Sequence, residues 1–217
     1  KFIAGAVILG ICIGLFIKFF FFGLYPFPGN YLLAWYEPWK SDHVVGSTIT
    51  IGHKPVVDDA LRHLYPLRVL SSDLLRIGQW PLWNPYNGAG MPLLALMHPG
   101  FFNPFGLFFL IFSAPFAWFL YIALSPVLLG IGTYWYCRKI GLGLWASLGS
   151  TATLLFSGFV VVRLLYGEFI YVFAGLPFML LVVEELFEKK FPAKSIFFLP
   201  IVVCFIFFSG QPQMILY

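Results

Sequence analysis

Acidic residues at two places in the chain could act as a general base. Asp58 and Asp59 precede a run of leucines spaced three or four residues apart, which predicts an amphipathic helix beginning there. A carboxylate held at that point could take a proton from a hydroxyl group. The structural alternative is that Asp58 caps the helix and Asp59 complements the helix dipole. The residues alone leave both interpretations open, because acids commonly gather in first turns.

Glu168 is the second candidate, because it ends a long apolar segment, beside Gly167 and five residues after Arg163. Ionisable groups at membrane depth are costly and often functional. A functional Glu168 would assist the aspartate directly or through a divalent cation such as Mg²⁺ or Mn²⁺, since hard cations prefer carboxylate oxygens. The alternative is an ion pair between Arg163 and Glu168 at the membrane interface.

Cationic residues near these acids could bind a phosphate group. Arginine makes bidentate contacts with phosphate oxygens, and histidine can bind phosphate or relay protons. Alternatively, the helix arginines face lipid headgroups, and the histidines are structural because they form no metal-ligand motif. The candidate phosphate-binding residues are Arg62, His63, Arg68, Arg76, His98 and Arg163.

A stretch rich in prolines, glycines and aromatics, Gln79–Gly106, follows the predicted helix. Proline and glycine make a chain turn repeatedly, so this stretch should be non-helical. Its aromatic content distinguishes it from a disordered linker, so we expect it to be packed. Four residues of its core are expected to shape the wall of a site: Trp83, Asn84, Tyr86 and Asn87.

The composition indicates an all-α, polytopic integral membrane protein. The 217 residues are 60% apolar and only 10% charged, with a mean hydropathy of +0.89, whereas soluble domains carry roughly a quarter charged residues. The chain begins at Lys1 and ends directly after an apolar segment, so we expect a fragment of a longer protein.

Five apolar segments are predicted to cross the membrane. The first loop, 23–113, is large and should be extracytoplasmic, with its amphipathic helix at 58–78. Phe105–Phe112 is too short to cross and is expected to be interfacial. The predicted spans are about 2–22, 115–137, 144–165, 169–187 and 195–209.

The positions of lysine and arginine predict the orientation. Lys1, Arg138-Lys139 and Lys189-Lys190-Lys194 fall on one side of the predicted spans, which the positive-inside rule makes cytoplasmic. The large loop and the Arg163–Glu168 connection then lie outside. The net charge of +4 therefore concerns topology, and we expect no nucleic-acid partner.

The run DDALRHLYPLRVLSSDLLRIGQWPLWNPYNGAGMPLLALMHPGFFNPF, which begins at Asp58, resembles the first extracytoplasmic loop of YfhO-type bacterial membrane proteins. Ser157–Pro177 and Ser209–Tyr217 fit the same family, so the resemblance covers nearly the whole chain, in order. The sequence departs from the family pattern at two places. Relatives often have Gly-His where this chain has Gly167-Glu168, and Gly-His-Pro-Gln where it has Gly210-Gln211-Pro212-Gln213.

The resemblance implies a GT-C-type glycosyltransferase in the bacterial cytoplasmic membrane, working among membrane lipids with its active face outside. Its donor would be a polyprenyl-phosphate-linked sugar and its acceptor a cell-envelope polymer, a glycolipid or a protein. On this reading one of Asp58 and Asp59 is the catalytic base.

Two alternatives are a transporter or lipid flippase without catalytic activity, and an inactive scaffold. A transporter should place polar or broken-helix residues near the middle of the membrane. The middle positions of these segments are nearly all apolar, which favours the enzyme.

Overall fold

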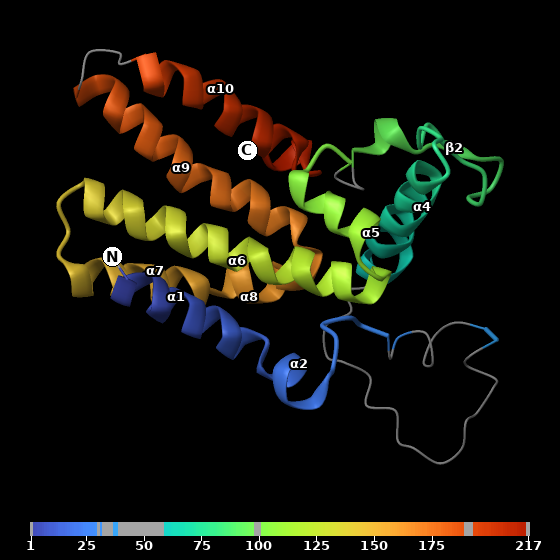
Figure 1. The fold of residues 1–217 in the computed structure, drawn as a ribbon, viewed down its shortest axis with the longest axis horizontal. Helices are drawn as coiled ribbons and strands as arrows, with labels where there is room; N and C mark the ends of the chain where they lie inside the picture. The colour runs from blue at the N-terminus through green and yellow to red at the C-terminus, as the bar shows by residue number, and fades with distance from the viewer. Residues whose placement is uncertain are drawn as a thin grey trace.

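The computed structural model describes residues 2–29, 31, 37–38, 59–97, 101–188 and 193–215. Over these ranges the protein is mostly helical, with a short β-hairpin at one end of a helical bundle (Figure 1). This is compatible with the predicted all-α membrane protein.

The helix α6 (Ala114–Lys139) runs through the middle of the bundle. It packs against α9 (Glu168–Glu188) on one side and against α1 (Phe2–Leu15) and α7 (Leu144–Leu155) on the other (Figure 1). The helix α10 (Ala193–Phe208) packs on α9. Because α6 has neighbours on both sides, residues within it such as Tyr121, Ile122 and Leu129 are completely buried.

Two described helices, α6 and α9, are long and apolar enough to cross a membrane. A third span results if α7 is joined to α8 (Gly158–Arg163) and η5 (Leu164–Tyr166), which are bent by 46° relative to α7. The helices α1 and α10 are apolar but shorter, with 14 and 16 residues, and α1 continues past Phe16 as α2 (Ile17–Phe22). The five predicted spans therefore remain a prediction.

Glycines allow the helices to approach closely. A Cβ atom at Gly175 of α9 would lie 2.1 Å from Ile206 Cγ1 of α10. A Cβ atom at Gly130 of α6 would lie 2.8 Å from Ile8 Cγ2 of α1. Both distances are shorter than any ordinary contact, so these two helix pairs depend on the absence of a side chain.

One end of the bundle carries Lys139 and Lys194 together with the acids Glu184, Glu185 and Glu188. Lys139, the last residue of α6, pairs with Glu188, the last residue of α9, and Arg138 donates to the Leu142 carbonyl. Lys194 lies at the start of α10, at the same end. The described part of the predicted cytoplasmic charges is thus gathered at one end, opposite the hairpin (Figure 1).

The predicted amphipathic helix is present in two parts, η2 (Ala60–Leu64), which is a π-helix, and α4 (Tyr65–Arg76). Pro66 lies in the first turn of α4, where its missing N–H is tolerated. Gly78, with a φ of +76°, ends the helix: its N–H bonds the Leu75 carbonyl, and Gln79 N bonds the Leu74 carbonyl. This Schellman motif confirms the predicted stop. Asp58, the predicted cap, lies outside the described residues.

The hairpin is made by β1 (Trp83–Asn84) and β2 (Met91–Pro92), which pair antiparallel and are followed by the 3₁₀ turn η3 (Leu94–Leu96). The side chain of Asn84 is buried and accepts a hydrogen bond from Tyr86 N at 2.9 Å.

The expectation that the aromatics of this stretch are packed is wrong for its first half. The exposed fractions of Trp80, Trp83 and Tyr86 are 64%, 53% and 82%. Their hairpin projects from the bundle end, so the described elements leave much of their surface uncovered (Figure 1).

The predicted interfacial segment 105–112 contains η4 (Pro104–Leu107) and the short helix α5 (Phe108–Ile111). Asn103 caps η4 by accepting a hydrogen bond from Phe105 N at 3.0 Å. The guanidinium of Arg76 donates to the carbonyls of Phe109 and Phe112 at 2.7 and 3.2 Å, which ties α4 to α5.

Candidate functional site

A cavity of about 440 Å³ lies at the hairpin end of the bundle. Its walls come from the loop helix, the hairpin, the η5–α9 junction and the segment after α10. The lining residues are Asp59, His63, Leu64, Leu67, Met91, Leu96, Arg163, Tyr166, Glu168, Phe169, Gln211 and Gln213. Four predicted site residues from distant parts of the sequence therefore share one cavity: Asp59, His63, Arg163 and Glu168.

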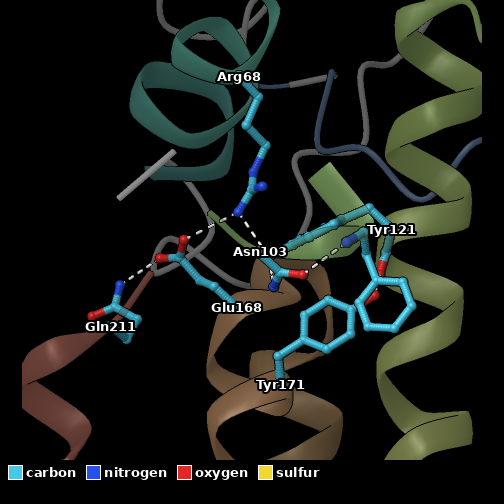
Figure 2. Close-up of polar contacts among 7 residues, drawn as sticks. Arg68, Asn103, Tyr121, Glu168, Tyr171 and Gln211 are labelled. Carbon is cyan, nitrogen blue, oxygen red and sulfur yellow. Dashed lines mark hydrogen bonds and ion pairs between the residues drawn. The ribbon is translucent and has the colours of Figure 1, made fainter. Parts of the chain in front are cut away.

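Glu168 is fully buried, with 0% of its surface exposed. Its Oε2 atom pairs with Arg68 Nη2 at 3.4 Å, and its Oε1 atom accepts a hydrogen bond from Gln211 Nε2 (Figure 2). The cation that pairs with it in the described contacts comes from the loop helix, 100 residues earlier in the chain. The sequence had offered Arg163 as the partner.

Arg68 is held against α6 by the side chain of Tyr121. The guanidinium carbon lies 3.9 Å from the centroid of the Tyr121 ring, and Nη2 donates to the Tyr121 hydroxyl at 2.8 Å. Asn103 Nδ2 also donates to that hydroxyl, at 3.5 Å. Tyr171 of α9 donates to the Tyr121 carbonyl at 2.7 Å (Figure 2). The alternative that Arg68 faces lipid headgroups is wrong, because only 3% of its surface is exposed.

Gly167 places Glu168 at the start of α9. Its φ of +64° belongs to a region that other residues rarely adopt. A Cβ atom at this position would lie 2.6 Å from Tyr121 Cε1. The chain therefore turns from η5 into α9 directly against Tyr121, which puts the Glu168 carboxylate at a helix N-terminus, where the helix dipole favours negative charge.

Arg163 and His63 bring cationic groups to the cavity. The Arg163 guanidinium carbon lies 5.0 Å from the ring centroids of Phe159 and Phe169, and the residue is half-buried. His63 and Asp59 are both exposed, on the loop helix. The site thus has an open side carrying Asp59 and His63 and a buried side carrying Glu168.

Other predicted site residues lie elsewhere. Arg62 is exposed and is not part of the cavity lining. Arg76 donates a hydrogen bond to the Phe109 carbonyl of α5. Asp58 and His98 lie outside the described residues. None of the four predicted wall residues, Trp83, Asn84, Tyr86 and Asn87, lines the cavity, because the hairpin presents Met91 to it instead.

Sequence reasoning missed Gln211, Gln213, Tyr121 and Asn103. Tyr121 and Asn103 carry no local signal, because one lies inside an apolar span and the other inside an aromatic stretch. Gln211 could have been found, since it lies at one of the two departures from the family pattern. Glu168 lies at the other departure, and the two side chains are hydrogen-bonded to each other.

Among the described residues, no group of three or more His, Cys, Asp and Glu side chains could hold a metal ion. A divalent cation between Asp59 and Glu168 stays a prediction.

The chain matches no protein-family model, no curated protein and no solved structure. The chemistry of the cavity must therefore be argued from its own residues.

The cavity combines an exposed carboxylate with cationic and amide donors. Asp59 could accept a proton from a bound hydroxyl, while Arg163, His63 and Gln213 could bind an anionic group. Arg68 pairs with Glu168, so Arg163 is the described arginine of the cavity lining that a ligand would meet. This combination suits the transfer of a group away from a phosphate.

Proposed function

We propose that this protein is a membrane glycosyltransferase that transfers a sugar from a polyprenyl-phosphate donor to an acceptor outside the bacterial cytoplasmic membrane. The observation that carries the proposal is the shared cavity. Asp59 of the loop helix lines it together with Arg163 and Glu168, which come from a distant part of the chain, at the end of the bundle opposite Lys139. The resemblance of the loop to YfhO-type proteins supports the same reaction.

Each residue has a defined part in the proposed reaction. Asp59 takes the proton from the acceptor hydroxyl as its oxygen attacks the anomeric carbon of the sugar. The bond between that carbon and the phosphate oxygen breaks, and polyprenyl phosphate leaves with the electron pair. Arg163 and His63 stabilise the charge that develops on the phosphate. Glu168 has both carboxylate oxygens engaged, so it assists instead of acting as the base.

The polar residues within the long helices support an enzyme over a transporter. Buried Ser125 and Thr133 of α6 donate to carbonyls of their own helix, at 2.8 and 2.7 Å. Thr151 of α7 does the same, at 2.8 Å. Hydroxyl groups satisfied in this way do not offer a polar path along the described helices.

The test is donor turnover by the full-length protein in bacterial membranes, with a panel of polyprenyl-phosphate sugars. We expect Asp59→Asn to lower turnover by about 10²–10⁴-fold, the usual contribution of a general base. Asp58→Asn tests the neighbouring aspartate, and Glu168→Gln tests the buried acid. Asp73→Asn is the matched control, because Asp73 is an exposed acid on the same helix that pairs with Arg76.

The outcomes separate the alternatives. Selective loss in Asp59→Asn, with normal membrane insertion, supports the transferase and its base. Full activity in all three site variants would refute the site. If wild type consumed no donor but moved lipid across the bilayer, the protein would be a flippase.

A further inference from the structure

The pair of Arg68 and Glu168 lies deeper than an ordinary membrane-interface ion pair. The exposed fractions of the two residues are 3% and 0%. Removing two charges from water costs several kcal/mol per ion, and their attraction compensates only when the geometry is good. Here the nitrogen and oxygen atoms are 3.4 Å apart, and only one guanidinium nitrogen takes part.

Stability does not account for an arginine at position 68. Its Nε and Nη1 atoms are buried and have no hydrogen-bond partner in the described part of the chain. Each such donor costs about 1–3 kcal/mol, and apolar residues of similar volume often replace a buried ion pair without loss of stability. Stability therefore gives no reason for the pair as a whole, which leaves a functional role for its two charges.

The surroundings of Arg68 fix that charge in place. The face of the guanidinium lies on the Tyr121 ring, and its Nη2 atom bonds both the Tyr121 hydroxyl and Glu168. Figure 2 shows Arg68 reaching down from the loop helix to the two residues, with Gln211 on the far side of Glu168. The carboxylate is thus held between Arg68 and Gln211.

We propose that Arg68 is a positioning residue: as the buried counter-ion of Glu168, it keeps this carboxylate charged and fixed in the cavity wall. Loss of the positive charge beside a buried carboxylate favours its protonated form. The consequence for sugar transfer rests on the proposed function, whereas the charge pairing does not.

The test uses dicyclohexylcarbodiimide, an apolar reagent that modifies protonated carboxyl groups. The acid proton moves to a nitrogen of the reagent while the carboxylate oxygen bonds its central carbon, and rearrangement leaves a stable N-acylurea. The full-length protein in membranes is treated, and modification of the peptide containing Glu168 is measured by mass spectrometry. A Glu168→Gln variant verifies that the adduct is on this residue.

We expect Glu168 to be resistant in wild type and at least about 10-fold more modified in Arg68→Met, because loss of the adjacent positive charge favours the protonated form of a buried carboxylate. Arg68→Lys, which keeps a positive charge, should keep Glu168 resistant to the carbodiimide. Arg76→Met is the matched control, because Arg76 is on the same helix but bonds the carbonyls of Phe109 and Phe112. Arg68→Gln serves as a second neutral variant if Arg68→Met does not insert.

Equal modification of Glu168 in wild type and in the neutral variants would overturn the proposal, and so would resistance of Glu168 in all of them. Modification of Glu168 in Arg68→Lys as strong as in Arg68→Met would also overturn it. Donor turnover is measured on the same samples. If the labelling pattern is as expected but wild type consumes no donor, the pair stands and the proposed function falls. If donor is consumed and Glu168 stays resistant without Arg68, the inference falls alone.

Discussion

Glu168 and Arg68 illustrate how strongly one side chain can depend on another inside this bundle. Each side chain is almost completely buried, and each lies on a different element. Breaking a buried pair by removing one partner leaves an uncompensated charge, which costs about 3–5 kcal/mol, whereas replacing both partners can be nearly neutral. The pair should therefore show strong non-additivity.

We predict that Arg68→Met alone lowers the free energy of unfolding by about 3–5 kcal/mol, and that adding Glu168→Gln recovers most of this loss. The physical reason is that the double variant removes both members of the pair, so neither is left without the other. The measurement is thermal or denaturant unfolding in detergent for the two single variants and the double variant. Simple additivity of the two single effects would contradict the pairing.

At the scale of elements, glycines determine how closely the helices meet. Gly175 faces Ile206 across the contact between α9 and α10, and Gly167 faces Tyr121 where η5 turns into α9. Neither role is visible in the sequence, because a glycine in an apolar segment looks the same whether or not it faces a partner.

We predict opposite outcomes for two Gly→Ala substitutions inside helices. Alanine is intrinsically the better helix former by about 1 kcal/mol. At Gly149 of α7, where a Cβ would meet nothing within 4 Å, the substitution should be neutral or stabilising. At Gly175 it should destabilise, because Cβ would lie 2.1 Å from Ile206 Cγ1.

Thermal unfolding of Gly149→Ala and Gly175→Ala checks this contrast between α7 and the α9–α10 contact. Adding Ile206→Ala to Gly175→Ala should restore stability by removing the colliding atoms. Equal stability of the two single variants would show that α9 and α10 do not pack at this distance.

Gly167→Ala should be harmful for two reasons. A sparsely populated backbone conformation such as this one costs about 1–3 kcal/mol for a residue with a Cβ, and that Cβ would lie 2.6 Å from Tyr121. We expect a lower unfolding temperature together with greater carbodiimide modification of Glu168, because Tyr121 supports Arg68. Gly158→Ala, at the start of α8, has no atom within 4 Å of its Cβ and should change neither quantity. Normal resistance of Glu168 in Gly167→Ala would show that Tyr121 does not hold Arg68.

Much of the element layout could be predicted from local patterns. The leucine spacing and Gly78 predicted a helix and its end, and both are present. Contacts between distant residues could not be predicted in this way. Asp59 and Glu168 were predicted separately, and only the fold brings them to one cavity. The partner of Glu168 was missed because Arg68 reaches it by packing of the loop helix on the bundle end.

At the scale of the whole molecule, the charge distribution predicts a direction across the membrane. Arg138, Lys139 and Lys194 lie at the end of the bundle opposite the cavity. The positive-inside rule predicts that this end faces the cytoplasm. With that orientation the cavity would open outside the cell, where lipid-linked sugars would be used by the proposed enzyme.

Single cysteines test this direction. In a variant with Cys12, Cys137 and Cys204 replaced by alanine, one cysteine is placed at Tyr86, which is 82% exposed on the hairpin. A second variant has it at Leu142, which is 36% exposed in the turn between α6 and α7. A membrane-impermeant maleimide should label position 86 in intact cells and position 142 only after the membrane is opened. The reverse pattern would place the cavity in the cytoplasm and exclude an extracytoplasmic sugar transfer, whatever chemistry Asp59 and Glu168 perform there.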